Sequence, residues 1–201
     1  MPTKEEVVEQ FRCQAIRDAA MRVVARKGYD HVTVQDIADE AGIAKGTVYL
    51  YFKSREDILQ KAMTFSFEEF HERIAAAIEG NGTFKDKIER VVKAQLEYFE
   101  ERQEFFRLYL AMAEPLGERR LKKHAAYRIH IARLTALIDD AKADGGVWDA
   151  PSERAAIVVA STIRDIALQR LAEKAPPPLA DDVAFVRDYI CRGIATRQEK
   201  S

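Results

Sequence analysis

The sequence has few of the residues that interrupt regular structure. Its 201 residues include nine glycines, six prolines and two cysteines, and there is no low-complexity tract. Cys13 and Cys191 lie far apart, which gives neither a disulfide framework nor the paired spacing of a zinc site. We therefore expect a helix-rich globular protein that works in a reducing cytoplasm.

Long hydrophobic runs are also missing. The N-terminal segment MPTKEEVVEQ has no apolar core of the kind found in signal peptides. The apolar run from Ala155 to Ile163 is too short to cross a bilayer. We expect neither secretion nor membrane insertion.

Neither sign of charge is in excess. The formal net charge is -1, and residues 1–55 carry nine Lys and Arg against eight Asp and Glu. This balance argues against a uniformly basic surface that coats nucleic acid. Any nucleic-acid site must arise from the placement of a few cations.

Motifs for catalysis and cofactor binding are absent as well. There is no GxSxG elbow, no phosphate-binding glycine loop and no HExxH. His124 and His130 lie about 240° apart around a helix, so they cannot share a metal without other ligands. We expect no enzyme, no cofactor and no metal site.

The helix signals that are present predict an all-α fold of about nine helices, since no run alternates like a strand. Capping boxes, in which a hydroxyl residue and an acid three positions later satisfy backbone N–H groups, mark three helix starts. They are Thr33 with Asp36, Ser54 with Asp57, and Thr83 with Asp86. The expected helices cover about residues 5–27, 33–42, 44–51, 54–79, 83–101, 104–114, 118–143, 151–174 and 180–196.

Two short helices that meet at Gly42 predict a helix-turn-helix over about residues 32–51. Gly42 can adopt the left-handed conformation of the turn, and the small Ala38 lets the helices approach. In the second helix, Ala44, Val48 and Phe52 share one side and should face the core. Gly46 then points outward.

An interior glycine costs roughly 0.5–1 kcal/mol relative to alanine, so Gly46 should serve a close approach to DNA. Around it lie cations for phosphates, hydroxyl donors, and rings or Leu50 for a thymine methyl. The alternative is an ordinary three-helix pack with an exposed polar helix. The predicted DNA-binding residues are Thr33, Ala44, Lys45, Gly46, Thr47, Tyr49, Leu50, Tyr51, Lys53 and Arg55.

The segment TVQDIADEAGIAKGTVYLYFKSREDIL resembles the DNA-binding signature of the TetR/AcrR family of transcriptional regulators. The resemblance implies a helix-turn-helix DNA-binding domain at residues 9–69 and a helical-bundle effector-binding and dimerisation domain at 70–201. Ala44 stands where relatives often have a hydroxyl residue, and Leu50 where many have a second aromatic. These departures leave the operator sequence open.

One recognition helix makes few base contacts, so we expect a homodimer on a palindromic operator. The resemblance implies that the last two helices form a four-helix bundle with those of a second copy. The alternative is that both helices pack only within the subunit. The expected dimer residues are Ile157, Ile163, Leu168, Val183, Val186, Ile190 and Ile194.

The aromatic segment YFEERQEFFRLYLAM belongs to the part that resembles the effector-binding body of the family. Aromatic stripes of this kind usually form core, but some can line a pocket for a small, mostly apolar or aromatic ligand. We assign no role to the basic stretch from Arg119 to His124. The candidate pocket residues are Tyr98, Phe105, Phe106, Tyr109, Met112, Tyr127, His130 and Arg164.

Together these features predict a repressor that a small ligand releases from its operator. One alternative is a structural DNA-binding protein of the same fold, acting in chromosome organisation or division control without an effector. Another is a ligand-binding or catalytic module that no longer binds DNA. Against this last alternative stands the presence of five residues suited to DNA contacts: Lys45, Tyr49, Tyr51, Lys53 and Arg55.

Overall fold

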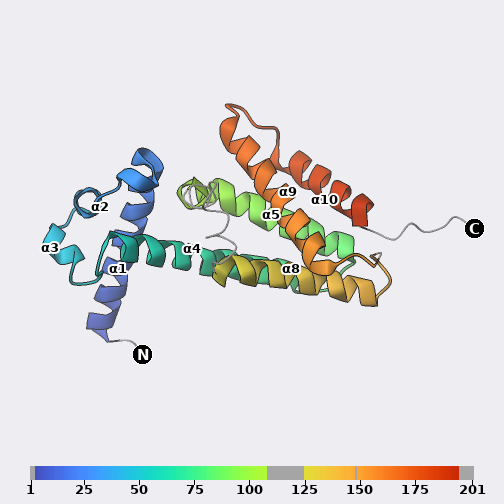
Figure 1. Cartoon of the computed structure of the whole chain (residues 1–201), viewed down its shortest axis with the longest axis horizontal. Helices are drawn as coiled ribbons and strands as arrows, with labels where there is room; N and C mark the ends of the chain where they lie inside the picture. The colour runs from blue at the N-terminus through green and yellow to red at the C-terminus, as the bar shows by residue number, and fades with distance from the viewer. Residues whose placement is uncertain (1–2, 108–124, 148, 195–201) are drawn as a thin grey trace, which may run out of the picture. The chain divides into compact units, whose positions relative to one another are not determined.

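The computed structural model describes residues 3–107, 125–147 and 149–194 (Figure 1). These residues are predominantly helical and contain no β-strand, which confirms the all-α prediction. None of their helices is both long and apolar enough to cross a bilayer. The elements are α1 (Lys4–Lys27), the 3-10 turn η1 (Tyr29–His31), α2 (Val34–Ala41), α3 (Lys45–Val48), α4 (Arg55–Ile78), α5 (Phe84–Glu101), α8 (Ala125–Ala143), α9 (Ser152–Ala172) and α10 (Leu179–Ile194).

The described residues fall into two compact units, one of residues 3–67 with 103–107 and one of residues 68–102 with the described part of 125–194. The division runs through α4. The remaining parts of the predicted sixth and seventh helices, including Tyr109, Met112 and the stretch from Arg119 to His124, lie outside the described residues.

The first unit is built around α1, which packs against α2. Fully buried small side chains, Ala19 and Ala20 of α1 and Ala38 of α2, allow the helices to approach closely. Gly42 ends α2 in the left-handed conformation (φ 67°, ψ 32°), as predicted from the sequence.

The helix α3 is shorter than predicted. It ends at Val48, and Tyr49, Leu50 and Tyr51 form a turn. The N–H groups of Leu50 and Tyr51 donate to the carbonyls three residues earlier, which tightens the chain out of α-helical geometry.

The second unit packs α8 against α9 and α10 against α5, and α5 also contacts α9. The predicted capping box of Thr83 and Asp86 begins α5. The side chain of Arg170 on α9 is 7% exposed. Its Nε donates to Glu100 of α5 at 2.8 Å and its Nη1 to the Pro177 carbonyl at 2.9 Å, and it also pairs with Asp182 of α10. This guanidinium therefore joins three helices of the unit.

Candidate nucleic-acid interface and effector body

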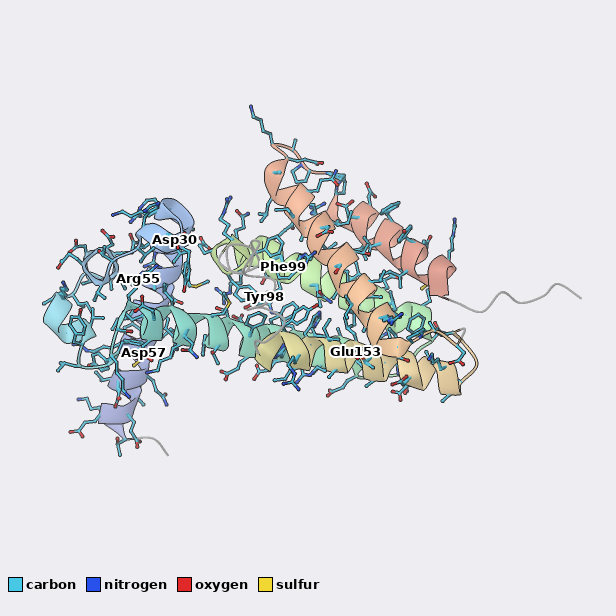
Figure 2. All side chains as sticks on the ribbon, viewed as in Figure 1. Asp30, Arg55, Asp57, Tyr98, Phe99 and Glu153 are labelled. Carbon is cyan, nitrogen blue, oxygen red and sulfur yellow. The ribbon has the colours of Figure 1, made fainter. Side chains whose placement is uncertain are left out.

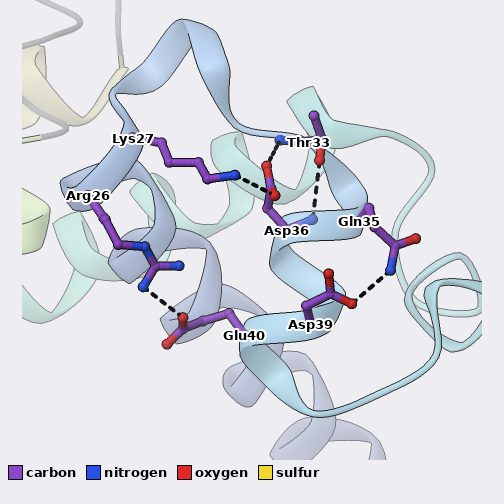
Figure 3. Close-up of polar contacts among 7 residues, drawn as sticks. All are labelled: Arg26, Lys27, Thr33, Gln35, Asp36, Asp39 and Glu40. Carbon is purple, nitrogen blue, oxygen red and sulfur yellow. Dashed lines mark hydrogen bonds and ion pairs between the residues drawn. The ribbon is translucent and has the colours of Figure 1, made fainter.

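The start of α2 is held by the predicted capping box (Figure 3). The Thr33 hydroxyl accepts a hydrogen bond from the Asp36 N–H at 3.1 Å, and Asp36 accepts one from the Thr33 N–H at 3.1 Å. Lys27 of α1 lies 2.6 Å from the same carboxylate. These hydrogen bonds, of which the one from Lys27 has the largest effect, lower the pKa of Asp36 to about 2. The N-terminus of α2, which carries the positive end of the helix dipole, and the exposed Thr33 are therefore held beside Asp36, whose charge is paired with Lys27.

The other acid that connects α2 with α1 is Glu40. It pairs with Arg22 at 2.7 Å and with Arg26 at 3.1 Å, and these contacts lower its pKa (Figure 3 shows the second pair). Two of the cations of α1 therefore hold α2 against α1 and neutralise a carboxylate that would otherwise repel phosphates.

The side chains of α3 and its following turn divide between core and surface largely as predicted. Val48 and Phe52 are buried, whereas Tyr49 and Leu50 are 50% and 79% exposed. Lys45 and Gly46 are exposed as well, and Thr47 and Tyr51 are half-buried. A Cβ added at Gly46 would meet no atom within 4 Å. The fold therefore does not require a glycine here, which is consistent with a role in binding.

Ala44 does not face the core, contrary to the prediction. It is the N-cap of α3, with extended backbone angles (φ -67°, ψ 142°), and its side chain is exposed. The 100° periodicity from which its direction was inferred applies only inside a helix. Its place on the surface keeps it among the candidate DNA-binding residues.

Lys53 and Arg55, the two basic residues at the start of α4, have different surroundings. Lys53 is exposed, and its backbone N–H donates to Asp57 at 2.9 Å. Half of the predicted capping box forms, because Asp57 donates its N–H to the Ser54 hydroxyl but reaches back to Lys53 instead of Ser54.

Arg55 (Figure 2) is engaged inside the unit. Its guanidinium donates to the Tyr29 carbonyl, lies 5.1 Å from the Tyr29 ring centroid and pairs with Glu56 at 3.0 Å. Sequence reasoning missed Tyr29, because nothing local signals a contact across 26 positions. Arg55 holds η1 against the start of α4, which leaves Lys53 as the exposed cation of this pair.

An exposed short helix after a left-handed glycine turn, with its preceding helix capped and charge-paired, defines a helix-turn-helix DNA-binding protein. Residues 16–62 match the family model of the bacterial regulatory proteins, tetR family. The chain is 43% identical over 77 residues to the fatty acid metabolism regulator protein of Bacillus subtilis, a match that spans 38% of this chain and 40% of that protein. The DNA-binding segment of this chain is therefore that of the TetR family of helix-turn-helix transcriptional regulators.

Solved structures agree with the fold over most of the chain. The fatty acid degradation regulator FadR from Bacillus halodurans superposes with a TM-score of 0.82 at 23% identity, covering 90% of this chain and 95% of that one. FadR from Bacillus subtilis, solved in complex with stearoyl-CoA, gives 0.79 at 23% identity and covers 90% and 98%. The similarity of fold therefore extends beyond the DNA-binding segment into the C-terminal helices.

The described candidate pocket residues are divided between the two units. Phe105 and Phe106 are buried in the first unit, where the Phe105 ring meets Phe67 edge-on at 5.1 Å. Tyr98, Tyr127, His130 and Arg164 belong to the second unit.

Within the second unit these four residues differ in their surroundings. Tyr98 (Figure 2) is fully buried with its hydroxyl 3.5 Å from Glu69; burial, together with that carboxylate, raises its pKa. His130 is buried too, whereas Tyr127 borders a groove on α8 and α9. Arg164 pairs with Asp165 at 3.0 Å.

The expected dimer stripe requires correction. Ile163, Val183, Val186 and Ile190 are at most 6% exposed and are therefore buried within the unit itself. Ile157 is half-buried in the groove between α8 and α9, Leu168 is 44% exposed, and the Ile194 side chain lies outside the described part.

The open apolar surface of these helices is a different stripe. Val158, Phe185 and Tyr189 are each about 60% exposed and border one groove on α9 and α10. The rings of Phe185 and Tyr189 stack at 6.2 Å. In the sequence, the signal for this exposed stripe is the four-residue spacing of Phe185 and Tyr189, which lie one position before the buried Val186 and Ile190.

Proposed function

We propose that this chain is a repressor that binds a palindromic operator as a homodimer and is released from it by a small, largely apolar effector. The exposed strip of Lys45, Gly46, Tyr49 and Leu50 carries this proposal. It offers a cation, an unobstructed backbone and apolar side chains on one short helix and the turn that follows it, while the neighbouring acids Asp36 and Glu40 are paired. Such a surface suits phosphates and base edges.

The homodimer is supported by the stripe of Val158, Phe185 and Tyr189. Exposed apolar side chains that gather along two adjacent helices are costly in a monomer and typical of an interface. A two-fold pair would present two recognition helices to the two halves of a palindrome.

The nature of the effector is supported by the interior of the second unit. Phe70, Tyr98 and Phe99 form a buried aromatic cluster there, and side chains of this kind are the usual lining of a site for an apolar ligand. One relative is named for fatty acid metabolism, and one structural neighbour was solved with stearoyl-CoA. We infer an effector that carries an acyl chain.

The test begins with a palindrome selected from random DNA by the purified protein. Fluorescence anisotropy of the labelled operator should show saturable binding that acyl compounds reverse. Release requires the ligand to prefer the conformation with low DNA affinity by a few kcal/mol. Binding to many unrelated sequences with no effect of any acyl compound would instead favour a structural DNA-binding protein.

A further inference from the structure

An open groove runs along α8 where this helix packs against α9. Its apolar lining includes Ile129, Ala132 and Ala136 of α8 and Ile157 of α9. Ile129 is 45% exposed, and both alanines are exposed as well. The groove shares no lining residue with the one that borders the exposed stripe of α9 and α10. Contiguous exposed apolar surface marks interaction sites, so α8 needs a partner of its own.

The two ends of this groove carry opposite charges. Arg128 borders one end, and Asp139 lies about three helical turns further along α8, or about 16 Å. The Ser152 hydroxyl donates to Asp139, so Glu153 (Figure 2), which also borders the groove, belongs to the acidic end. Among the described residues, none of these three charged side chains forms an ion pair. The groove therefore offers one unpaired cation at one end and two acids at the other.

This order of charges becomes complementary to itself when it is reversed. If a second α8 lies antiparallel to the first, Arg128 of each copy faces Asp139 of the other. The same register sets Ala132 opposite Ala136, because both pairs have their midpoint near Leu134. Alanines lack bulk, so the two helix axes can approach to about 8 Å. Four residues spaced by three or four positions share this side of the helix and are called the α8 face: Arg128, Ala132, Ala136 and Asp139.

We propose that the α8 face pairs with the same face of a second copy, held by reciprocal ion pairs between Arg128 and Asp139. An isologous contact of this kind is the usual one in homo-oligomers. Together with the homodimer of the proposed function, on which this step rests, it joins two dimers into a tetramer. Among the lining residues of the groove, one large apolar side chain, Ile129, is exposed, against three in the stripe of α9 and α10. The contact is therefore the weaker of the two and forms as the protein concentration rises.

Sedimentation velocity over a concentration series tests this pairing. The unmodified protein should be dimeric when dilute and should approach the tetramer as its concentration rises. Arg128→Glu should raise the dissociation constant of the tetramer at least about tenfold, because the glutamate would face Asp139 of the other copy. Lys174→Glu, the same charge reversal at an exposed position between α9 and α10, is the matched control and should leave this constant unchanged. A protein that stays dimeric up to its solubility limit would overturn the inference.

Exchanging the two charges gives a sharper test. The double variant Arg128→Glu with Asp139→Arg should recover the tetramer, because each new ion pair again forms between copies. The two positions are about three turns apart on one helix, so this rescue cannot arise within one chain. A folded double variant that remains dimeric would contradict the antiparallel register.

Asp139 also accepts the Ser152 hydroxyl, so a second variant guards against misfolding of the first. Ala136→Glu places a carboxylate in the centre of the α8 face and should abolish the tetramer. Ala180→Glu, at an exposed position of α10, is its control and should retain the tetramer. Equal tetramer formation by both variants would overturn the inference.

The outcomes separate this inference from the proposed function. If the variants of the α8 face remain dimers that bind the operator, the pairing and the proposed homodimer both stand. If these variants change the Tm or the effector affinity but not the mass, another segment of the chain or the effector covers the face, and the inference is wrong. If Arg128→Glu is a monomer where the unmodified protein is a dimer, the α8 face is confirmed and the proposed interface on α9 and α10 is wrong.

Discussion

Lys27 and Asp36 form an ion pair, with Nζ 2.6 Å from Oδ1, that joins the end of α1 to the first turn of α2. The same carboxylate accepts the Thr33 N–H and so completes the cap of α2. One acidic side chain thus fixes both where the helix-turn-helix begins and how its first helix meets α1.

Asp36 should therefore contribute to stability in a defined pH range. Its pKa is lowered from 3.8 to about 2, so the contribution is complete above pH 3.8 and is lost as the pH falls towards 2. Asp36→Asn should flatten the pH dependence of urea unfolding in this window. Asp30→Asn, in the exposed part of η1, is the control and should leave the slope unchanged.

His130 should impose a second pH dependence with the same sign. Its pKa falls from 6.5 to about 3 on folding, so between these values the unfolded chain binds more protons. Stability should rise with pH by up to about 1.4 kcal/mol per unit across this window and level off above 6.5. Urea titrations should show this slope, and His130→Phe should remove it. An unchanged slope would mean that His130 is protonated in the folded protein.

Gly46→Leu should separate folding from DNA binding. The position has open space around a new Cβ, so the Tm should remain within a degree or two, as for other exposed sites. A leucine there would hold the backbone away from DNA, and operator affinity should fall at least about tenfold, as for loss of a base contact. Gln169→Leu adds the same side chain at an exposed site of α9 and should keep full affinity. Normal operator binding by Gly46→Leu would contradict the proposal that the backbone at Gly46 approaches DNA closely.

Lys53 and Arg55 should behave differently although both are basic. Lys53→Ala should weaken operator binding and reduce the slope of log K against log salt by about 0.9, the value for one lost phosphate contact. Arg55→Ala should mainly lower the Tm, because Arg55 contacts Tyr29 within the unit. Binding isotherms at several salt concentrations, with melting curves for both variants, distinguish the two roles.

Phe185→Glu should dissociate the homodimer. Phe185 stands exposed in the apolar stripe of α9 and α10, where a carboxylate would be buried without a partner on association. Light scattering should report a monomer, and operator affinity should fall. Asp181→Lys, an exposed charge change at the start of the same helix, should remain dimeric. A dimeric Phe185→Glu protein would place the interface elsewhere.

Local rules predicted much of the DNA-binding region. Three features could be predicted because each depends on residues within one or two helical turns. They are the left-handed turn at Gly42, the cap at Thr33 and the burial of Val48. The predicted inward direction of Ala44 was wrong because α3 begins one residue later, at Lys45, so helical periodicity does not apply to Ala44.

The failures in the second unit have a different origin. The sequence shows that α10 has two apolar stripes, but which one faces α5 and α9 depends on side chains far along the chain. The structure buries Val186, which was predicted to lie in the interface, and exposes Phe185, which was not among the predicted interface residues. Likewise, the contact between Arg55 and Tyr29 spans 26 positions and leaves no local pattern.

Arg170 gives this unit a property that bears on assembly. By holding Glu100, Asp182 and the Pro177 carbonyl together, it fixes α9 and α10 to α5 before any second copy arrives. An interface on this face would then be preorganised, and pairing would cost little additional conformational entropy.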